Sequence, residues 1–389
     1  MIVNLAKSTW KRVTFGDVVR NANETVRDAE AAGIDRVIAM EHMDPGKLKI
    51  QRWGSLEDGT TFARRVQPGQ TLFGKRRAYQ RKAAYAEFDA ICSGDILTFE
   101  TDKAQMLSEF LPFLVQSNEF FDHALGTSVG SLSPRTNWRD LANFEFDLPP
   151  LDDQKRISDL LWAVEANARS THEARAAATA AKSTWLEPKI SALLERAAVP
   201  FSEIWSRSPE SGWSVAPVDE ATGRYVLSLA ALGPEGYRSG NLKSIPNMEK
   251  ARAATLRAGD LLISRANTAD AVGRAGIYSE DRSDVSFPDT MMRVSLKDDV
   301  LATFAIAVLG SEHGRAHMRR SAAGSATSMV KINRSSLGRL RFPVASPDEQ
   351  ASLLADFGRF EAAVAALHAE AESVAMLRSS LLTDIFEGK

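Results

Sequence analysis

Two stretches of the sequence decide the fold: Leu148-Pro-Pro-Leu-Asp-Asp-Gln154 and the later Phe342-Pro-Val-Ala-Ser-Pro-Asp-Glu-Gln350. Each ends in a glutamine and is followed by a long helical pattern. The two glutamines are 196 residues apart, which is about half of the 389-residue chain. The same offset pairs other positions: Asp153 with Glu349, Leu141 with Leu337, Asn137 with Asn333, Arg135 with Lys331, and Glu165 with Glu361. The sequence therefore predicts two copies of one structural plan.

The repeat extends upstream, where Pro68–Lys75 resembles Ala258–Arg265 at an offset of 190 residues, a change that one loop deletion explains. Each copy combines short β-like runs with one expected helix, Gln105–Leu125 or Ala302–Arg320. The β-like runs are Asp35–Ala39, Ile96–Phe99, Tyr225–Leu229 and Met292–Leu296. We therefore expect an α+β protein with two mixed α/β domains, 1–148 and 196–345, each followed by a long helix, 149–195 and 346–389.

Both long helices carry an apolar seam with heptad spacing. Its positions are Ile157, Leu161, Val164 and Ala168 in the first helix, and Leu353, Phe357, Phe360, Val364, Leu367 and Val374 in the second. At about 1.5 Å per residue each helix would reach roughly 60 Å, which exceeds the width of its own domain. We therefore expect the helices to pair. Pro188 is expected to kink or end the first helix near Glu187.

Composition excludes several classes of protein. Cys92 is the only cysteine, so a disulfide framework and a cysteine-based zinc site are excluded, and a reducing cytoplasm is expected. The N-terminus has no long apolar core, and no run of about 18 apolar residues predicts a membrane span. His313 and His317 are four residues apart, but no neighbouring acid completes a metal site, so we expect packed or solvated histidines and no bound metal.

Catalytic motifs are scarce. The sequence has no nucleotide-binding loop of the Gly-x-x-x-x-Gly-Lys-Ser/Thr or Gly-x-Gly-x-x-Gly type. Gly126-Thr-Ser-Val-Gly130 matches the nucleophile string of hydrolases, which requires a strand before the serine and a helix after it. Here a helix precedes Ser128, and the matching stretch of the second copy, 324–328, has no aligned serine. A serine hydrolase stays a minor alternative, and no catalytic residue is expected.

The net charge of −2 weighs against a nucleic-acid-binding protein, yet two segments are locally basic. Residues 72–85 carry five basic side chains interleaved with tyrosines and no acid, and residues 310–341 carry Glu312 as their one acid. A solvated basic face is the alternative for either segment alone. Recurrence in both copies favours DNA contacts, for which the candidates are Lys75, Arg76, Arg77, Tyr79, Arg81, Lys82, Ser131, Arg135, Asn137, Arg265, Asn267, Arg274, Ser325, Thr327 and Lys331.

This organisation resembles the specificity subunit of type I restriction–modification systems. The resemblance covers essentially the whole chain and is most specific at Leu148–Ile157, Ser346–Gln350 and Leu377–Gly388. It implies two target-recognition domains, each reading one half of a split site in double-stranded DNA, and an antiparallel coiled coil formed by the two long helices. It also implies two methyltransferase subunits and motor–nuclease subunits as partners. S-adenosylmethionine, ATP and Mg would bind those partners, and no cofactor would bind this chain.

The first domain departs from the family pattern, because Phe73-Gly-Lys75 stands where the second domain has the more usual Ile263-Ser-Arg265. A second hypothesis stays open, in which the same fold serves as an adaptor or decoy that does not read DNA. Salt-dependent DNA binding by the assembled complex would distinguish the two.

Overall fold

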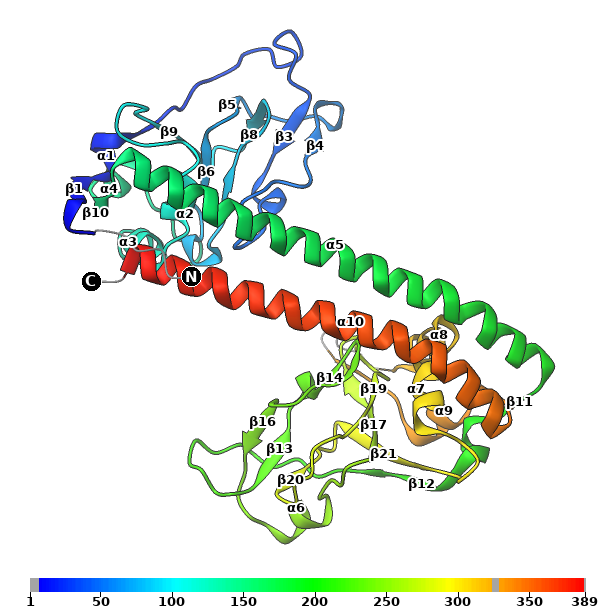
Figure 1. Ribbon diagram of the computed structural model, residues 1–389. Helices are drawn as coiled ribbons and strands as arrows, with labels where there is room; N and C mark the ends of the chain where they lie inside the picture. Colours follow the sequence, from blue (N-terminus) through cyan, green and yellow to red (C-terminus); the bar gives the residue numbers. More distant parts are fainter. Residues whose placement is uncertain (1–6, 324–328, 388–389) are drawn as a thin grey trace. The chain divides into compact units, whose positions relative to one another are not determined.

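The computed structural model describes residues 7–323 and 329–387 (Figure 1). The chain forms two compact units, Met1–Ser170 together with Ala371–Lys389, and Thr171–Glu370. Two long helices, α5 (Leu151–Arg196) and α10 (Pro347–Leu382), each contribute to both units. The predicted α+β class and the two long helices are confirmed. In the described part of the chain, no helix has the length and apolar character needed to cross a membrane.

The first unit contains two four-stranded sheets. One has the order β2 (Val19–Asn21), β9 (Ile96–Thr101), β6 (Thr71–Gly74), β7 (Ala83–Tyr85), and the other β4 (Gly54–Ser55), β3 (Arg36–Ile38), β8 (Ala90–Cys92), β5 (Arg64–Val66). A further pair joins β1 (Lys11–Thr14) to β10 (Glu145–Leu148). Its short helices are α1 (Phe15–Val18), α2 (Leu111–Val115), α3 (Asn118–Gly126) and α4 (Trp138–Leu141). The core includes a phenylalanine cluster in which the Phe15 ring lies 5.3 Å from Phe99 and 5.0 Å from Phe120.

The second unit repeats this plan. Its main sheet has the order β12 (Trp205–Ser211), β21 (Met291–Leu296), β17 (Leu261–Ser264), β19 (Ala275–Ile277), and a second sheet the order β16 (Leu242–Ser244), β13 (Tyr225–Leu227), β20 (Val285–Ser286). Three strand pairs complete it: β11 (Ala198–Pro200) with β23 (Arg341–Pro343), β14 (Leu232–Gly233) with β15 (Gly236–Tyr237), and β18 (Ala266–Asn267) with β22 (Val330–Lys331). The helices are α6 (Glu249–Ala253), α7 (Ala302–Gly310), α8 (Glu312–Ser321) and α9 (Arg334–Gly338).

The single helix predicted in each half is wrong, because a serine divides each into two. Ser117 follows α2 and accepts a hydrogen bond from the amide of Phe120, which makes it the N-cap of α3. Ser311 caps α8 in the same way, accepting from the amide of Gly314. A serine side chain competes for backbone donors and so starts a new helix instead of continuing the old one. Residues 105–110 lie before α2 and outside any helix.

A buried glutamine fastens the start of each long helix to its domain. The Gln154 side chain accepts from the amide of Leu107 (2.8 Å) and donates to the carbonyls of Gln105 (2.9 Å) and Pro149 (2.8 Å). Gln350 repeats this set, accepting from Leu301 (2.8 Å) and donating to Asp299 (2.8 Å) and Ala345 (2.9 Å). Both amides are almost fully buried. The glutamines therefore hold the loop before α2 or α7 against the helix start.

The two long helices contact each other with antiparallel pairing inside each unit. In the first unit Arg378 of α10 forms an ion pair with Glu165 of α5. In the second, Lys182 of α5 lies 2.8 Å from Glu361 of α10, so the same ion pair recurs with the helices exchanged. Of the seam positions, Ile157, Leu161, Val164, Phe357, Val364 and Val374 are buried, and Ala168, Leu353, Phe360 and Leu367 are half-buried.

Pro188 does not end the first helix, so that part of the expectation is wrong. Helix α5 continues through it to Arg196. Proline inside a helix removes one hydrogen bond and crowds the preceding turn. Here Leu186, Ile190 and Leu194, on both sides of the proline, are buried in the core of the second unit. Tertiary packing therefore holds the helix where local propensity would break it.

We predict that Gln154→Leu lowers the free energy of unfolding by about 2–4 kcal/mol, because buried backbone groups around the side chain lose their partners. Gln350→Leu should have the same effect through the second unit. Urea denaturation followed by circular dichroism measures both changes. Gln51→Leu, at an exposed glutamine, is the matched control and should cost less than about 0.5 kcal/mol. An unchanged stability in Gln154→Leu would contradict the role assigned to the amide.

We further predict that Cys92 is inert in the folded protein. The thiol is fully buried, and burial raises its pKa to about 12. At pH 8 only about one thiol in ten thousand would be ionised, and the thiolate is the reactive form. A thiol reagent such as dithionitrobenzoate should therefore label the chain only after denaturation. Rapid labelling of the native protein at this pH would contradict the buried placement.

Candidate nucleic-acid interface

A basic corner of the first unit forms where the chain leaves strand β6. The amide of Lys75 donates to the carbonyl of Asp95 (3.0 Å), and the carbonyl of Lys75 accepts from the amide of Thr136 (3.0 Å). The next residue, Arg76, forms an isolated antiparallel bridge with Arg135. Backbone pairing thus brings Lys75, Arg76 and Arg135 together, although 60 residues separate Lys75 from Arg135.

One carboxylate lies between the arginines of this corner. Arg76 Nη1 is 3.6 Å from Asp95 and Arg135 Nε is 3.1 Å from it, while Arg76 Nε donates to Ser133 Oγ (2.7 Å). The arginine side chains remain 42% and 50% exposed. Partial burial lowers the pKa of Lys75, and the nearby charge of Arg64 lowers it further. Four cations, Lys75, Arg64, Arg76 and Arg135, lie near one acid here, so the corner keeps excess positive charge that a phosphate could neutralise.

Other basic residues of segment 72–85 make contacts within the unit. Arg81 donates to the carbonyl of Gln116 (3.1 Å), lies 4.5 Å from the Phe121 ring, and has its pKa lowered by burial. Lys82 donates to the carbonyl of Met40 (2.7 Å). Arg77 adopts a left-handed conformation with φ of 57°, and its amide donates to Pro134 (2.7 Å). Among these neighbours Tyr79 is exposed, with 56% of its surface accessible.

The loop that follows α3 carries the remaining candidates of the first unit. Ser131 is exposed within the turn closed by the bridge between Val129 and Arg135. Asn137 is exposed at the N-cap position of α4, where its side chain makes no capping bond. Its counterpart Asn333 caps α9 by accepting from the amide of Ser336 (2.8 Å). The candidates Ser325 and Thr327 lie outside the described residues.

The second unit repeats the backbone of the basic corner. The carbonyl of Arg265 accepts from the amide of Ile332 (2.9 Å), as that of Lys75 accepts from Thr136. Strands β18 and β22 pair Ala266 with Lys331 and Asn267 with Val330. Arg265, Asn267 and Lys331 therefore lie together at the position equivalent to the corner of the first unit. Arg265 Nη1 donates to the carbonyl of Asp289 (3.2 Å), and Lys331 is exposed.

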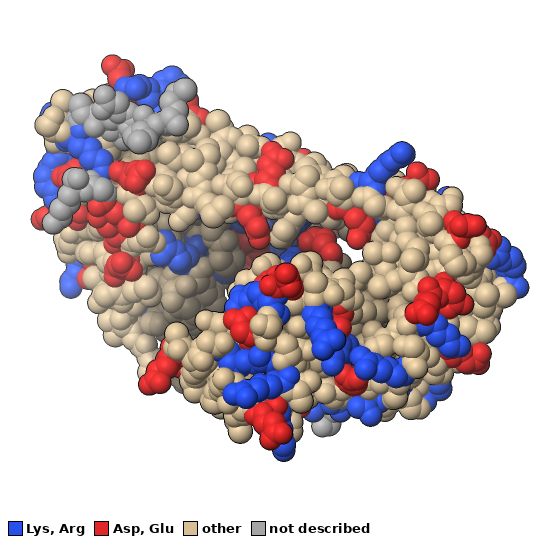
Figure 2. Space-filling view, turned by 60° about the horizontal axis from the view of Figure 1, so that its bottom comes forward, with Lys and Arg blue, Asp and Glu red and all other residues tan. Residues whose placement is uncertain are grey.

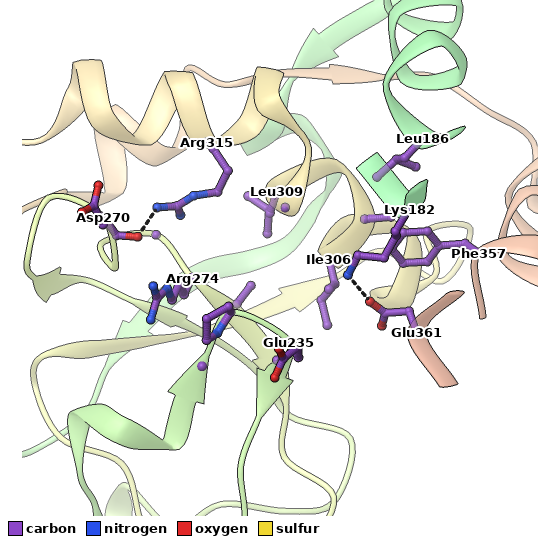
Figure 3. A pocket seen from close by; sticks show the side chains of 17 residues that line it. Lys182, Leu186, Glu235, Asp270, Arg274, Ile306, Leu309, Arg315, Phe357 and Glu361 are labelled. Atoms are coloured by element: carbon purple, nitrogen blue, oxygen red, sulfur yellow. Dashed lines mark hydrogen bonds and ion pairs between the residues drawn. The ribbon is translucent and has the colours of Figure 1, made fainter. Parts of the chain in front are cut away.

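Arg274 has a different environment from the one expected. Its side chain lines a pocket of about 230 Å³ in the second unit, together with Glu235, Asp270 and Arg315 (Figure 3). Arg315 donates to the carbonyls of Val272 (2.8 Å) and Asp270 (2.9 Å). Burial lowers the pKa of Arg274, and the neighbouring Arg238 lowers it further.

Sequence reasoning missed three members of the first corner: Arg64, Asp95 and Ser133. Arg64 donates to the carbonyls of Gly94 and Ile96 and so supports the turn that carries Asp95. These residues are far from Lys75 in sequence and follow no periodic pattern. The repeat was the available signal, since Arg135 matches Lys331 and points to the segment that contains Ser133.

The structure does not support the catalytic and metal-binding alternatives. Ser128 follows helix α3 and donates to the carbonyl of Ala124 (2.7 Å), so the strand–serine–helix turn of a hydrolase is not formed. His313 contacts the carbonyl of Arg341 and His317 that of Ser336, both at 2.8 Å. Within the described ranges, no group of three or more His, Cys, Asp or Glu residues could hold a metal ion.

Positive charge is local rather than continuous. On the face drawn in Figure 2, Lys and Arg side chains are interspersed with Asp and Glu. Many cations are engaged in ion pairs, such as Arg293 with Glu210 (2.6 Å) and Arg282 with Asp284 (2.7 Å). Excess charge at the two corners is therefore compatible with a net charge of −2.

Comparison with known proteins identifies the relatives of this chain. The family model described as the type I restriction modification DNA specificity domain matches residues 7–178. The type I restriction enzyme EcoDI specificity subunit of Escherichia coli is 32% identical over 103 residues, which are 26% of this chain and 22% of that subunit. This chain thus spans about a fifth of the length of the curated relative that it matches.

Solved structures were also compared with this chain, and one of them shares its fold over almost the whole length. The type I restriction–modification S subunit from M. genitalium has a TM-score of 0.58 and 12% identity, covering 97% of this chain and 96% of that one. The HsdS subunit from Thermoanaerobacter tengcongensis has a TM-score of 0.40 and 18% identity, covering 98% and 97%. Residues 7–178 thus match the family model of the type I restriction modification DNA specificity domain, and the chain resembles in its fold the S subunit of a type I restriction–modification system.

Proposed function

We propose that this chain is the DNA sequence-recognition subunit of a type I restriction–modification complex and reads a bipartite site in double-stranded DNA. The observation that carries the proposal is the corner that occurs in both units, Lys75, Arg76 and Arg135 in one and Arg265, Asn267 and Lys331 in the other. Arginine and lysine bind phosphates, while arginine and asparagine can also read purine edges in the major groove.

Two similar corners in one chain suit a split site. A symmetric dimer reads two half-sites of the same sequence. The corners here share their backbone but differ in side chains, since Arg76 is matched by Ala266 and Arg135 by Lys331. The two half-sites would therefore differ in sequence.

The paired helices would set the distance between the half-sites. They would also dock two methyltransferase subunits, which motor–nuclease subunits join for restriction. S-adenosylmethionine, ATP and Mg would bind those partner subunits in the cytoplasm. This chain would direct their reactions to a DNA site without catalysing them. An adaptor or decoy that keeps the fold without reading DNA is the second hypothesis. It predicts no salt-dependent binding of DNA by the assembled complex.

We predict that Arg265→Ala relaxes recognition at one half-site and that Arg76→Ala combined with Arg135→Ala relaxes it at the other. A specific arginine contact contributes about 1–3 kcal/mol, so modification of the cognate half-site should fall about 10- to 100-fold. Mapping methylated adenines after co-expression with the methyltransferase subunits measures both. Arg20→Ala removes an exposed arginine that pairs with Glu100 (2.8 Å) and is the control that should change nothing. An unchanged methylation map in both variants would refute these assignments.

Lengthening the helices tests their role as a spacer. Seven residues inserted into α5 after Ser170 and seven into α10 after Glu370 keep both heptad registers. Each helix gains about 10 Å, equivalent to about three base pairs of B-DNA. We expect a spacer longer by about three base pairs, flanked by unchanged half-sites, in the methylation map. An insertion of four residues into each helix breaks the register and should abolish modification. A functional seven-residue variant with the original spacer would show that the helices do not set this distance.

A further inference from the structure

The second unit contains an apolar groove of about 300 Å³ beside helix α10. Its walls come from α10, α7 and strands β15 and β19, and its lining includes Ile277, Ile306, Leu354, Phe357 and Gly358. The groove shares Glu235, Gly236, Ile306, Phe357 and Glu361 with the pocket that Arg274 lines (Figure 3). The two hollows are thus adjacent parts of one surface.

A tryptophan fills the equivalent place in the first unit. Trp162 of α5 lies 5.0 Å from the Phe113 ring and 5.4 Å from the Tyr85 ring. Its indole Nε1 donates to the carbonyl of Glu109 (3.1 Å). The side chain therefore bridges α5, α2 and strand β7.

The internal repeat assigns a counterpart to each of these residues. The offset that pairs Gln154 with Gln350 pairs Trp162 with Gly358. Tyr85 pairs with Thr71 across the sheet, and Ile277 pairs with Leu261 at the equivalent place, so Ile277 is the counterpart of Tyr85. Phe113 lies four residues before the cap Ser117 and Ala307 four before the cap Ser311, so Ala307 is the counterpart of Phe113. Three aromatic side chains of the first unit are thus a glycine, an isoleucine and an alanine in the second. The groove is the space that these smaller residues leave.

Gly358 faces that space directly. A Cβ placed on it would meet no atom within 4 Å. Glycine costs about 1 kcal/mol relative to alanine inside a helix, so nothing local favours it on this helix face. The side chains that line an empty apolar hollow also lack the van der Waals contacts that a filled hollow would give them.

Arg274 adds a half-buried cation next to the groove. Within the described residues its guanidinium donates no hydrogen bond and forms no ion pair, whereas Arg315 and Lys182 in the same pocket both have partners. A guanidinium binds a carboxylate through two parallel hydrogen bonds. Aromatic side chains seated in pockets, beside arginine, are typical anchors of protein interfaces.

We propose that the groove at Gly358 is a docking site for a segment of a partner protein that inserts an aromatic side chain and places a carboxylate on Arg274. Because Trp162 fills the equivalent place in the first unit, this partner binds once per chain. That distinguishes it from a pair of identical subunits that would use both units alike. The site goes beyond the proposed reading of DNA and does not depend on it.

Indole-3-propionate, which joins an indole to a carboxylate, is the probe for this site. We expect it to shift the methyl NMR signals of Ile277 and Ile306 in the full-length chain, with one site per chain, and to leave those of the core residues Ile157 and Ile190 unchanged. Arg274→Gln should weaken binding of this probe about tenfold. It should not change binding of 3-methylindole, which lacks the carboxylate.

Gly358→Trp fills the groove from within and should abolish the shifts. Gly358→Ala is the control, because it also raises helix propensity but leaves the groove open, and it should bind as the unaltered chain does. Gly358→Leu provides a second blocking variant if the tryptophan impairs folding. Absence of shifts in the unaltered chain, or equal shifts in the blocked variants, would overturn the proposal. Arg265→Ala, which should relax DNA recognition, changes no residue of the groove or its neighbouring pocket and should leave the probe shifts unchanged, so a failure here is distinguishable from a failure of DNA recognition.

Discussion

The structure depends on the pairing of α5 with α10 inside each unit. A helix of 46 or 36 residues is longer than the domain beside it, so its apolar stripe needs a second helix. The first unit obtains this partner from the end of the chain, where Leu382 and Ile385 enter the same core as Ile157 and Leu161. The ion pair between Glu165 and Arg378 recurs as Glu361 with Lys182. One repeated sequence therefore satisfies both units, with the helices exchanging roles.

In each unit a short segment of the same design connects the basic corner to the start of a long helix. Arg135 and Lys331 each stand 19 residues before the buried glutamine that fastens a long helix. Between them lie a short helix and a single strand, α4 and β10 in one unit and α9 and β23 in the other. In both units a histidine of the preceding helix contacts a backbone carbonyl of the short helix. His123 contacts that of Asp140 in α4 (2.9 Å), and His317 contacts that of Ser336 in α9 (2.8 Å). The corners are therefore held in the same way relative to the helix starts.

Much of this plan could be predicted from sequence because the repeat carries it. Residues that match at an offset of 196 positions predicted two domains and two long helices. Short apolar runs predicted the strands near Arg36, Ile96, Tyr225 and Met292. Two expectations about helices failed for different reasons. Serine caps, a local signal that the apolar pattern concealed, divided the expected helices, whereas core packing, which no local pattern encodes, carried α5 through Pro188.

The candidate site was harder to predict than the fold, because a basic side chain looks the same in sequence whether it faces water or a carbonyl. Of the basic run 75–82, Lys75 and Arg76 lie in the corner with Asp95, while Arg81 and Lys82 donate to backbone carbonyls. Asp95 itself reaches the corner through the pairing of β9 with β6. Only the repeat distinguished Arg135, since a cation recurs at Lys331 where the rest of the loop has diverged.

A chain with a net charge of −2 can still bind DNA through a small number of unpaired cations, provided that they are well placed. Most arginines outside the corners are engaged by acids or carbonyls, and those add little to the attraction of a polyanion. Each phosphate that is neutralised releases about one counterion, so a few contacts per unit give a modest, salt-dependent affinity. Such an affinity leaves discrimination to the base contacts and leaves tight binding to the assembled complex. Arg76 and Arg135 of the first corner are replaced by Ala266 and Lys331 in the second. Under the proposed function, this difference would let the same backbone corner read a different sequence in each unit.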